Sequence, residues 1–161
     1  MYDDCIPVTY VGLRRTQHLG DPVMVFSPVT SPNKVFGIVI NPDTARSLLK
    51  SETRMECVGC LNTPAPHDVM VDLLAGGGLV PEAVVIHGKP GQGQPIRGAL
   101  FVSDAQGHPL DAIPIRPSDG AALALRTGIS VAVKLETLAL LTLYPIERMP
   151  YREYGEDDRD L

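Results

Sequence analysis

Apolar residues along this chain occur in short runs separated by clusters of Gly, Pro, Asn and Asp. Short runs rich in β-branched residues predict strands, whereas apolar residues three and four apart predict helices. The strand pattern occurs at residues 6–15, 23–26, 34–40, 83–87, 96–102, 110–115 and 129–133. The first three of these runs predict an antiparallel meander. The leucine-rich run 135–143 fits a short helix or a strand.

Two helices are expected between the third and fourth strands. Asn41 can cap a helix that has Pro42 at its first position and Asp43 in its first turn, and this helix is expected to reach about residue 50. Pro66 opens the second helix, which glycines 76–78 interrupt. The apolar positions are Ala45, Leu48 and Leu49 in the first helix, expected to face inward, and Val69, Met70, Leu73 and Leu74 in the second.

The third helix carries the densest set of signals in the chain, at residues 116–128. Pro117 suits a first helical position, and Ser118 and Asp119 place a hydroxyl and a negative charge at the unpaired N–H groups of the first turn. Leu123 and Leu125 are expected to form the inner surface, and Gly128 to end the helix. Because Arg116 lies where a strand leads into this helix, the junction is a natural place to hold an anion.

Together these patterns predict an α+β domain with a mostly antiparallel or mixed sheet of about seven or eight short strands and three main helices. The 161 residues suit one domain, which we assign to residues 1–150. Residues 151–161 carry five acidic residues against two arginines, and we expect them to form a disordered tail. A loop of the length of 51–65 is uncommon in a compact domain and is often functional. The glycine-rich stretch 88–95 is interpreted as a hairpin loop, since it lacks the spacing of a phosphate loop.

The charge distribution limits the partners that the chain can have. Its net charge is −5, and no basic stripe is present, which argues against tight non-specific nucleic-acid binding but leaves room for a local phosphate site. No run approaches the roughly 18 apolar residues that a membrane helix needs. The acidic start does not resemble a secretory signal, so we expect a cytoplasmic protein.

Three cysteines do not suggest a disulfide framework. Cys57 and Cys60 have the spacing of half a zinc site, which only Cys5 and His67 could complete. A chance pair of reduced thiols is the preferred interpretation, and metal binding by this pair stays open.

The order of motifs resembles the bifunctional nuclease domain family, which is found in bacteria and plants. The resemblance covers residues 6–140 and depends on Pro66-His67-Asp68, the strand Val-Val-Ile-His, and the stretch 116–128. It implies an α+β domain, usually oligomeric, to which combined DNase and RNase activity has been attributed in some plant members. His67 and Asp68 match the family's His-Asp, and residues 116–119 match its Arg-Pro-Ser-Asp. Thr44 stands in place of a family glutamate, with Asp43 as a shifted substitute, so the chain resembles a divergent member.

These residues suggest a phosphodiester hydrolase. Arg116 and Ser118 would hold the phosphate, and His67 would act as a general base. Asp68, Asp72 and Asp119 would hold Mg²⁺ or Mn²⁺, since oxygen ligands suit these ions. The catalytic set is therefore predicted to be His67, Asp68, Arg116 and Asp119.

An architectural role explains the same residues without any substrate. Ser118 and Asp119 suit the first turn of any helix, Arg116 can pair with Asp68 or Asp119, and His67 can anchor the preceding loop. Two functions follow: a weak, metal-assisted nuclease, or a non-catalytic binding, regulatory or assembly module that holds an anionic ligand or a protein partner. In both cases we expect a homo-oligomer, because short strands leave sheet edges to protect.

Overall fold

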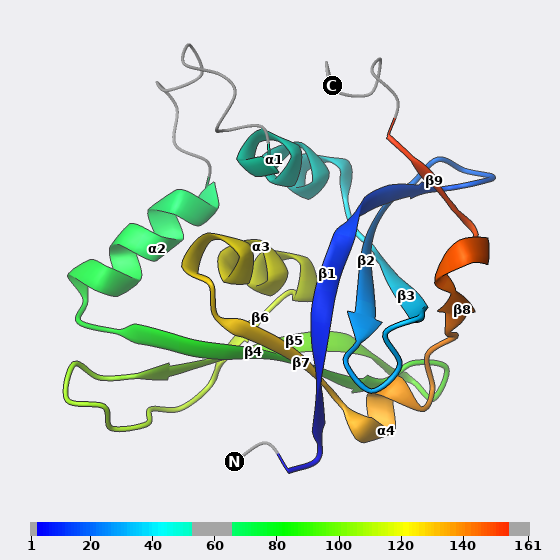
Figure 1. Ribbon diagram of the computed structural model, residues 1–161. Helices are drawn as coiled ribbons and strands as arrows, with labels where there is room; N and C mark the ends of the chain where they lie inside the picture. The colour runs from blue at the N-terminus through cyan, green and yellow to red at the C-terminus, as the bar shows by residue number, and fades with distance from the viewer. Residues whose placement is uncertain (1–2, 53–65, 155–161) are drawn as a thin grey trace.

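Nine strands form one mixed sheet in the computed structural model, which describes residues 3–52 and 66–154 (Figure 1). Their order is β6-β5-β4-β7-β1-β2-β3-β8, with β9 paired to β1, and every pairing is antiparallel except that of β4 with β7. The strands are β1 (Cys5–Thr16), β2 (Pro22–Pro28), β3 (Lys34–Val39), β4 (Val80–Lys89), β5 (Gln94–Ser103), β6 (Ile113–Ile115), β7 (Ser130–Lys134), β8 (Tyr144–Pro145) and β9 (Tyr151–Glu153). The predicted α+β class is confirmed, and β1 to β3 form the expected meander.

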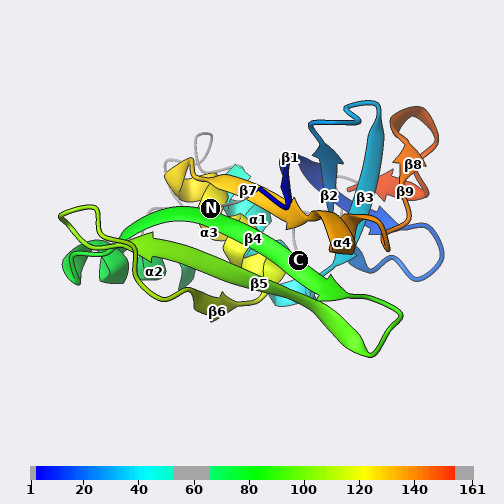
Figure 2. The same cartoon turned by 90° about the horizontal axis from the view of Figure 1, so that it is seen from below.

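Three helices lie on one side of this sheet (Figure 1). They are α1 (Pro42–Glu52), α2 (Pro66–Gly76) and α3 (Pro117–Thr127); the short helix α4 (Leu135–Leu138) and a 3₁₀ turn (Ile146–Arg148) follow later in the chain. Seen from below, β4 and β5 lie in front of α2 and α3 (Figure 2). Helices α2 and α3 therefore cover one face of the β4–β5 pair (Figure 2), and α3 contacts both α1 and α2.

The starts of these helices form as their local sequences predict. The Asn41 side chain accepts a hydrogen bond of 2.8 Å from the Thr44 N–H at the start of α1. Ala45 and Leu48 of this helix are buried, as predicted. Pro117 occupies the first turn of α3, and Gly128 ends that helix with φ of 76°, in the left-handed region that favours glycine.

The core divides into clusters that follow the two halves of the sheet. In the meander half, the rings of Phe26 and Phe36 stack with their centroids 5.7 Å apart. In the other half, α3 packs on β4 and β5 through buried Val84, Leu100 and Leu123. These clusters fix α3 against the sheet, so the residues at its N-terminus have a defined position.

Gly120 lets α3 approach β4 closely. A Cβ atom at this position would lie 2.7 Å from Cγ1 of Val84, which is fully buried. We therefore expect Gly120→Ala to lower the free energy of unfolding by about 1–3 kcal/mol, because the added methyl group forces a packed core to move. Urea denaturation measures this effect. Alanine in place of Gly76, whose Cβ would meet no atom within 4 Å, is the control, and an equal loss in both variants would contradict the expectation.

The predicted inner surface of α3 needs correction, and the apolar positions of α2 divide between the core and the solvent. Leu123 is fully buried, but Leu125 is 44% exposed, because two residues turn the helix by about 200° and cannot share a face. In α2, Met70 and Leu74 pack against the core, whereas Val69 and Leu73 are exposed.

Two predicted segments differ from the structure, and in a third, the run 135–143, the structure has the helix of the two alternatives. The strand expected at 110–115 is only β6, since Asp104 accepts hydrogen bonds from the N–H groups of Gln106 and His108 and holds the preceding residues in a turn. The run 135–143 begins with α4 and contains no strand.

The tail expected from residue 151 begins instead with β9, where Tyr151 packs beside Val23 and Val35. Residues 53–65, with the Cys57–Cys60 pair, and residues 155–161 lie outside the described residues.

Candidate functional site

The N-terminus of α3 is built around the side chain of Asp119. Arg116 follows β6 and is the N-cap residue of α3 in an extended conformation, and its carbonyl accepts a hydrogen bond from the Gly120 N–H. The Arg116 side chain makes no capping hydrogen bond to this helix. Ser118, predicted to hold phosphate, is buried. Asp119 is instead directed to a histidine and an arginine.

Arg116 and Asp119 form a two-point ion pair across one turn of helix. The Arg116 Nε and Nη2 donate to Oδ2 and Oδ1 of Asp119, the second bond at 3.1 Å. The Arg116 side chain is 62% exposed, while that of Asp119 is 17% exposed. Of the two partners predicted for Arg116, the structure therefore selects Asp119, and it leaves one end of the pair at the surface.

His67 joins this pair to the other two helices. Its Nε2 lies 3.0 Å from Oδ1 of Asp119, and its Nδ1 lies 3.0 Å from Oγ of Ser47 on α1. An ionised carboxylate only accepts hydrogen bonds, so Nε2 carries a proton, and in the neutral ring Nδ1 accepts the Ser47 hydroxyl proton. The imidazole is 5% exposed. The helix starts of α2 and α3, identified separately in the sequence, thus meet at a buried polar cluster.

Ser47 is the member of this cluster that the sequence analysis did not identify. It is buried on α1, as is Thr44 three residues earlier. Two polar residues at helical spacing beside the apolar Ala45 and Leu48 were the available signal, because buried hydroxyl groups require hydrogen-bond partners.

The surroundings of Asp119 favour its ionised form. Burial acts to raise the pKa of this carboxyl group, but hydrogen bonds from Arg116 and His67 outweigh that effect, and the pKa lies below its ordinary value. Asp119 is therefore a carboxylate at neutral pH, fully engaged by its two donors.

Asp68 makes a second connection between α2 and α3. Its Oδ1 accepts a hydrogen bond of 3.0 Å from Nε of Arg126, whose side chain is 8% exposed. Nη1 of Arg126 also donates to the carbonyl of Ala122 within α3. Arg126 was thus a further functional-looking residue of the 116–128 motif to which the sequence analysis gave no role.

The carboxylates predicted to bind Mg²⁺ or Mn²⁺ do not form one group. Asp68 pairs with Arg126, Asp119 pairs with Arg116 and His67, and Asp72 is exposed on α2. Among residues 3–52 and 66–154, no three His, Cys, Asp or Glu side chains are arranged to hold a metal ion. The described residues therefore do not supply the ligand set that this prediction requires.

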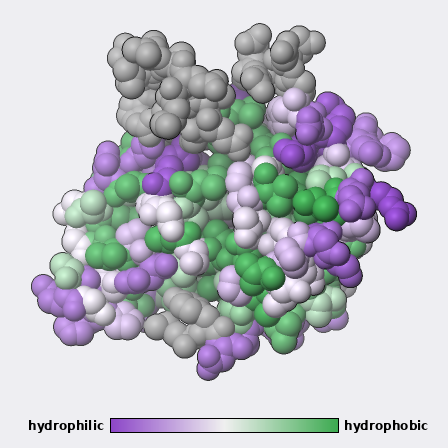
Figure 3. Space-filling view, in the orientation of Figure 1, coloured by the Kyte–Doolittle hydropathy of each residue, from purple (hydrophilic) through white to green (hydrophobic). Residues whose placement is uncertain are grey.

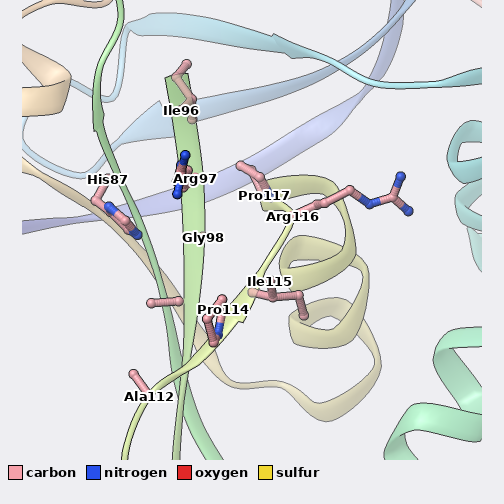
Figure 4. Close-up of a pocket in the computed structure, with 10 residues that line it drawn as sticks. His87, Ile96, Arg97, Gly98, Ala112, Pro114, Ile115, Arg116 and Pro117 are labelled. Atoms are coloured by element: carbon pink, nitrogen blue, oxygen red, sulfur yellow. The ribbon is translucent and has the colours of Figure 1, made fainter. Parts of the chain in front are cut away.

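A cavity of about 470 Å³ lies on the other side of the β6–α3 junction. Figure 4 shows His87, Arg97 and Pro114 near one side of β5, while the Arg116 side chain extends away from them. Glycine at position 98 permits this arrangement, because a Cβ there would lie 2.7 Å from the carbonyl oxygen of Ile115. Arg116 therefore borders the cavity through its backbone, while its guanidinium lies on the side of helix α3 (Figure 4).

Comparison with protein-family models finds none that matches the chain, and comparison with curated sequences finds no match either. Within the described residues, no helix has the length and apolar character needed to cross a membrane.

Proposed function

We propose that the chain is a divergent member of the bifunctional nuclease domain family that acts as a non-catalytic module and binds an anionic partner near Arg116. The observation that carries this proposal is the state of His67, which is buried and has both ring nitrogens engaged by Ser47 and Asp119. The neutral ring has one acceptor, Nδ1, and this atom faces the buried hydroxyl of Ser47. A general base for phosphodiester hydrolysis must instead accept a proton from the attacking water, so the role we assign to His67 is to hold three helices together.

Arg116 is the group in this cluster that can reach a partner. Asp119 occupies two of its donors and fixes the side chain, and the guanidinium remains largely exposed at the start of α3. An oriented arginine beside a helix N-terminus favours phosphate or carboxylate groups. The net negative charge of the chain supports recognition of one local anionic group over binding along a polyanion.

Phosphodiester hydrolysis with Mg²⁺ or Mn²⁺ is the second candidate. It is favoured by the convergence of His67 and Asp119, which are 52 residues apart in the chain and lie within hydrogen-bond distance together with Arg116. This is the residue set that the family resemblance implies for catalysis.

One experiment separates the two candidates. Full-length protein is titrated into fluorescein-labelled single- and double-stranded oligonucleotides at low salt, with EDTA, Mg²⁺ or Mn²⁺, and both anisotropy and cleavage are recorded. We expect saturable binding without cleavage, weakened several-fold by Arg116→Gln and unchanged by Arg148→Gln, an exposed arginine of the 3₁₀ turn.

Two results would overturn the binding proposal. Divalent-ion-dependent cleavage that disappears in a folded Asp119→Asn variant would establish hydrolysis instead. Equal behaviour of Arg116→Gln and Arg148→Gln would remove Arg116 from recognition. Circular dichroism of each variant shows whether the fold is kept.

The same proposal includes a cytoplasmic location and self-association. Cys5 is a free thiol, as is usual in a reducing compartment. Figure 3 shows hydrophobic residues in the middle of the face seen in Figure 1, and Val69, Leu73 and Leu125 on α2 and α3 are exposed. Light scattering of the samples used above tests self-association, and a monomer at micromolar concentration would remove this part.

A further inference from the structure

The cavity beside β5 has the size and lining of a small-molecule site. Its volume of about 470 Å³ falls within the range of roughly 300–1,000 Å³ that such sites span. Most of its wall is apolar and consists of small or rigid residues, namely Ile96, Ala99, Ala112, Pro114 and Ile115. Because the side chains of Ala99 on β5 and Ala112 in the loop before β6 are single methyl groups, they do not fill this space.

Two polar side chains lie together in this otherwise apolar wall. His87 on β4 and Arg97 on β5 are directly opposite in the antiparallel register, and Figure 4 shows them side by side. Neither side chain forms a hydrogen bond or ion pair within the part of the chain that the structure describes. This contrasts with Arg116 and Arg126, each of which has a carboxylate partner.

The two groups offer different chemistry to a ligand. Burial, together with the positive charges of Lys134 and Arg97, lowers the pKa of His87, so its ring is neutral at pH 7 and offers one donor and one acceptor. Arg97 supplies a charged planar donor set that matches a carboxylate or phosphate. A few convergent polar groups in an apolar cavity are the usual composition of a site that fixes the orientation of a ligand.

We propose that this cavity binds a small organic anion, with its carboxylate or phosphate on Arg97, a second polar atom on His87, and its apolar body against Ala99, Pro114 and Ile115. This site is independent of the anion recognition assigned to Arg116. Its polar groups come from β4 and β5, and the Arg116 guanidinium extends away from it (Figure 4).

The test is a titration of the full chain, followed by ¹⁵N–¹H correlation spectra. The probes are 2-naphthoate, octanoate and phenyl phosphate, which distinguish aromatic, aliphatic and phosphorylated ligands, and the neutral control is 2-naphthamide. We expect saturable shifts at the amides of Gly98 and Ala99 and at the His87 ring with at least one anion. 2-Naphthamide should bind at least tenfold more weakly than 2-naphthoate, because a neutral amide cannot form a charge-assisted pair with Arg97.

Variants locate the binding. Ala99→Leu should abolish the shifts by filling the cavity, while Ala105→Leu, in an exposed turn outside the lining, should leave them unchanged. Arg97→Gln, at an exposed strand position, should weaken the anion about tenfold without unfolding the chain. The proposal is overturned if none of the anions gives saturable shifts, if naphthoate and naphthamide bind equally, or if Ala99→Leu and Ala105→Leu behave alike.

Discussion

Replacement of Asp68 by alanine is expected to lower the free energy of unfolding by about 3 kcal/mol. The substitution removes the carboxylate that pairs with Arg126, whose guanidinium is almost entirely withdrawn from solvent between α2 and α3. Removing one partner of a buried ion pair is costly, mainly because the remaining charge stays buried after losing its counter-charge. Urea denaturation at pH 7, followed by circular dichroism, measures the change.

Asp72→Ala is the matched control for this prediction. Asp72 lies one turn further along α2, is exposed, and should change stability by no more than about 0.5 kcal/mol. Asp68→Asn keeps an acceptor oxygen for Arg126, so its loss of unfolding free energy should lie between those of Asp68→Ala and Asp72→Ala. If Asp68→Ala and Asp72→Ala lose the same stability, Asp68 does not hold α2 against α3, and its predicted role in a metal site becomes the better explanation of its place in the motif.

Sequence signals located the helix starts because those signals are local. Asn41, Pro66 and Pro117 each act within a few residues of their own position, and each helix begins where they indicate. The ends of strands were harder to predict from the sequence, because they depend on pairing with other strands. Strand β9 is an example, because the acidic composition of its segment predicted disorder. Instead, the ring of Tyr151 packs against that of Tyr144, and the strand pairs with β1 through Arg15 and Arg152.

The candidate site was predictable residue by residue but not as an assembly. His67, Asp68, Arg116 and Asp119 were identified from their positions at helix starts. Their pairing depends on the parallel contact of β4 with β7, because the connection between these strands carries α3 across the sheet beside α1 and α2. That contact pairs residues 47 positions apart in the chain, such as Ala83 and Ser130, and has no local signal. Arg126 was missed for the same reason, while the spacing of Thr44 and Ser47 beside Ala45 and Leu48 could have indicated a buried hydroxyl on α1 but not its partner.

Replacement of Asp119 by alanine is expected to cost about 2 kcal/mol at pH 7 and to change the response of the protein to acid. The substitution leaves the buried Nε2–H of His67 without an acceptor and removes the partner of Arg116. Since the folded pKa of Asp119 lies below its ordinary value, this carboxylate contributes stability that is fully present above about pH 4 and is lost as the pH falls through the folded pKa. The difference in unfolding free energy between wild type and variant should therefore be largest at neutral pH and shrink in acid.

Denaturation curves of both proteins between pH 2 and 7 measure that difference directly. Asp111→Ala serves as the control, because Asp111 is exposed in the loop before β6 and lies outside the cluster, so its curve should run parallel to that of the wild type. A difference between wild type and Asp119→Ala that stays constant through pH 2 would mean that the charge of Asp119 does not stabilise the fold. The three helices would then be held by contacts that do not need Asp119, among them the Asp68–Arg126 pair, and the place of Asp119 beside Arg116 would favour the hydrolase.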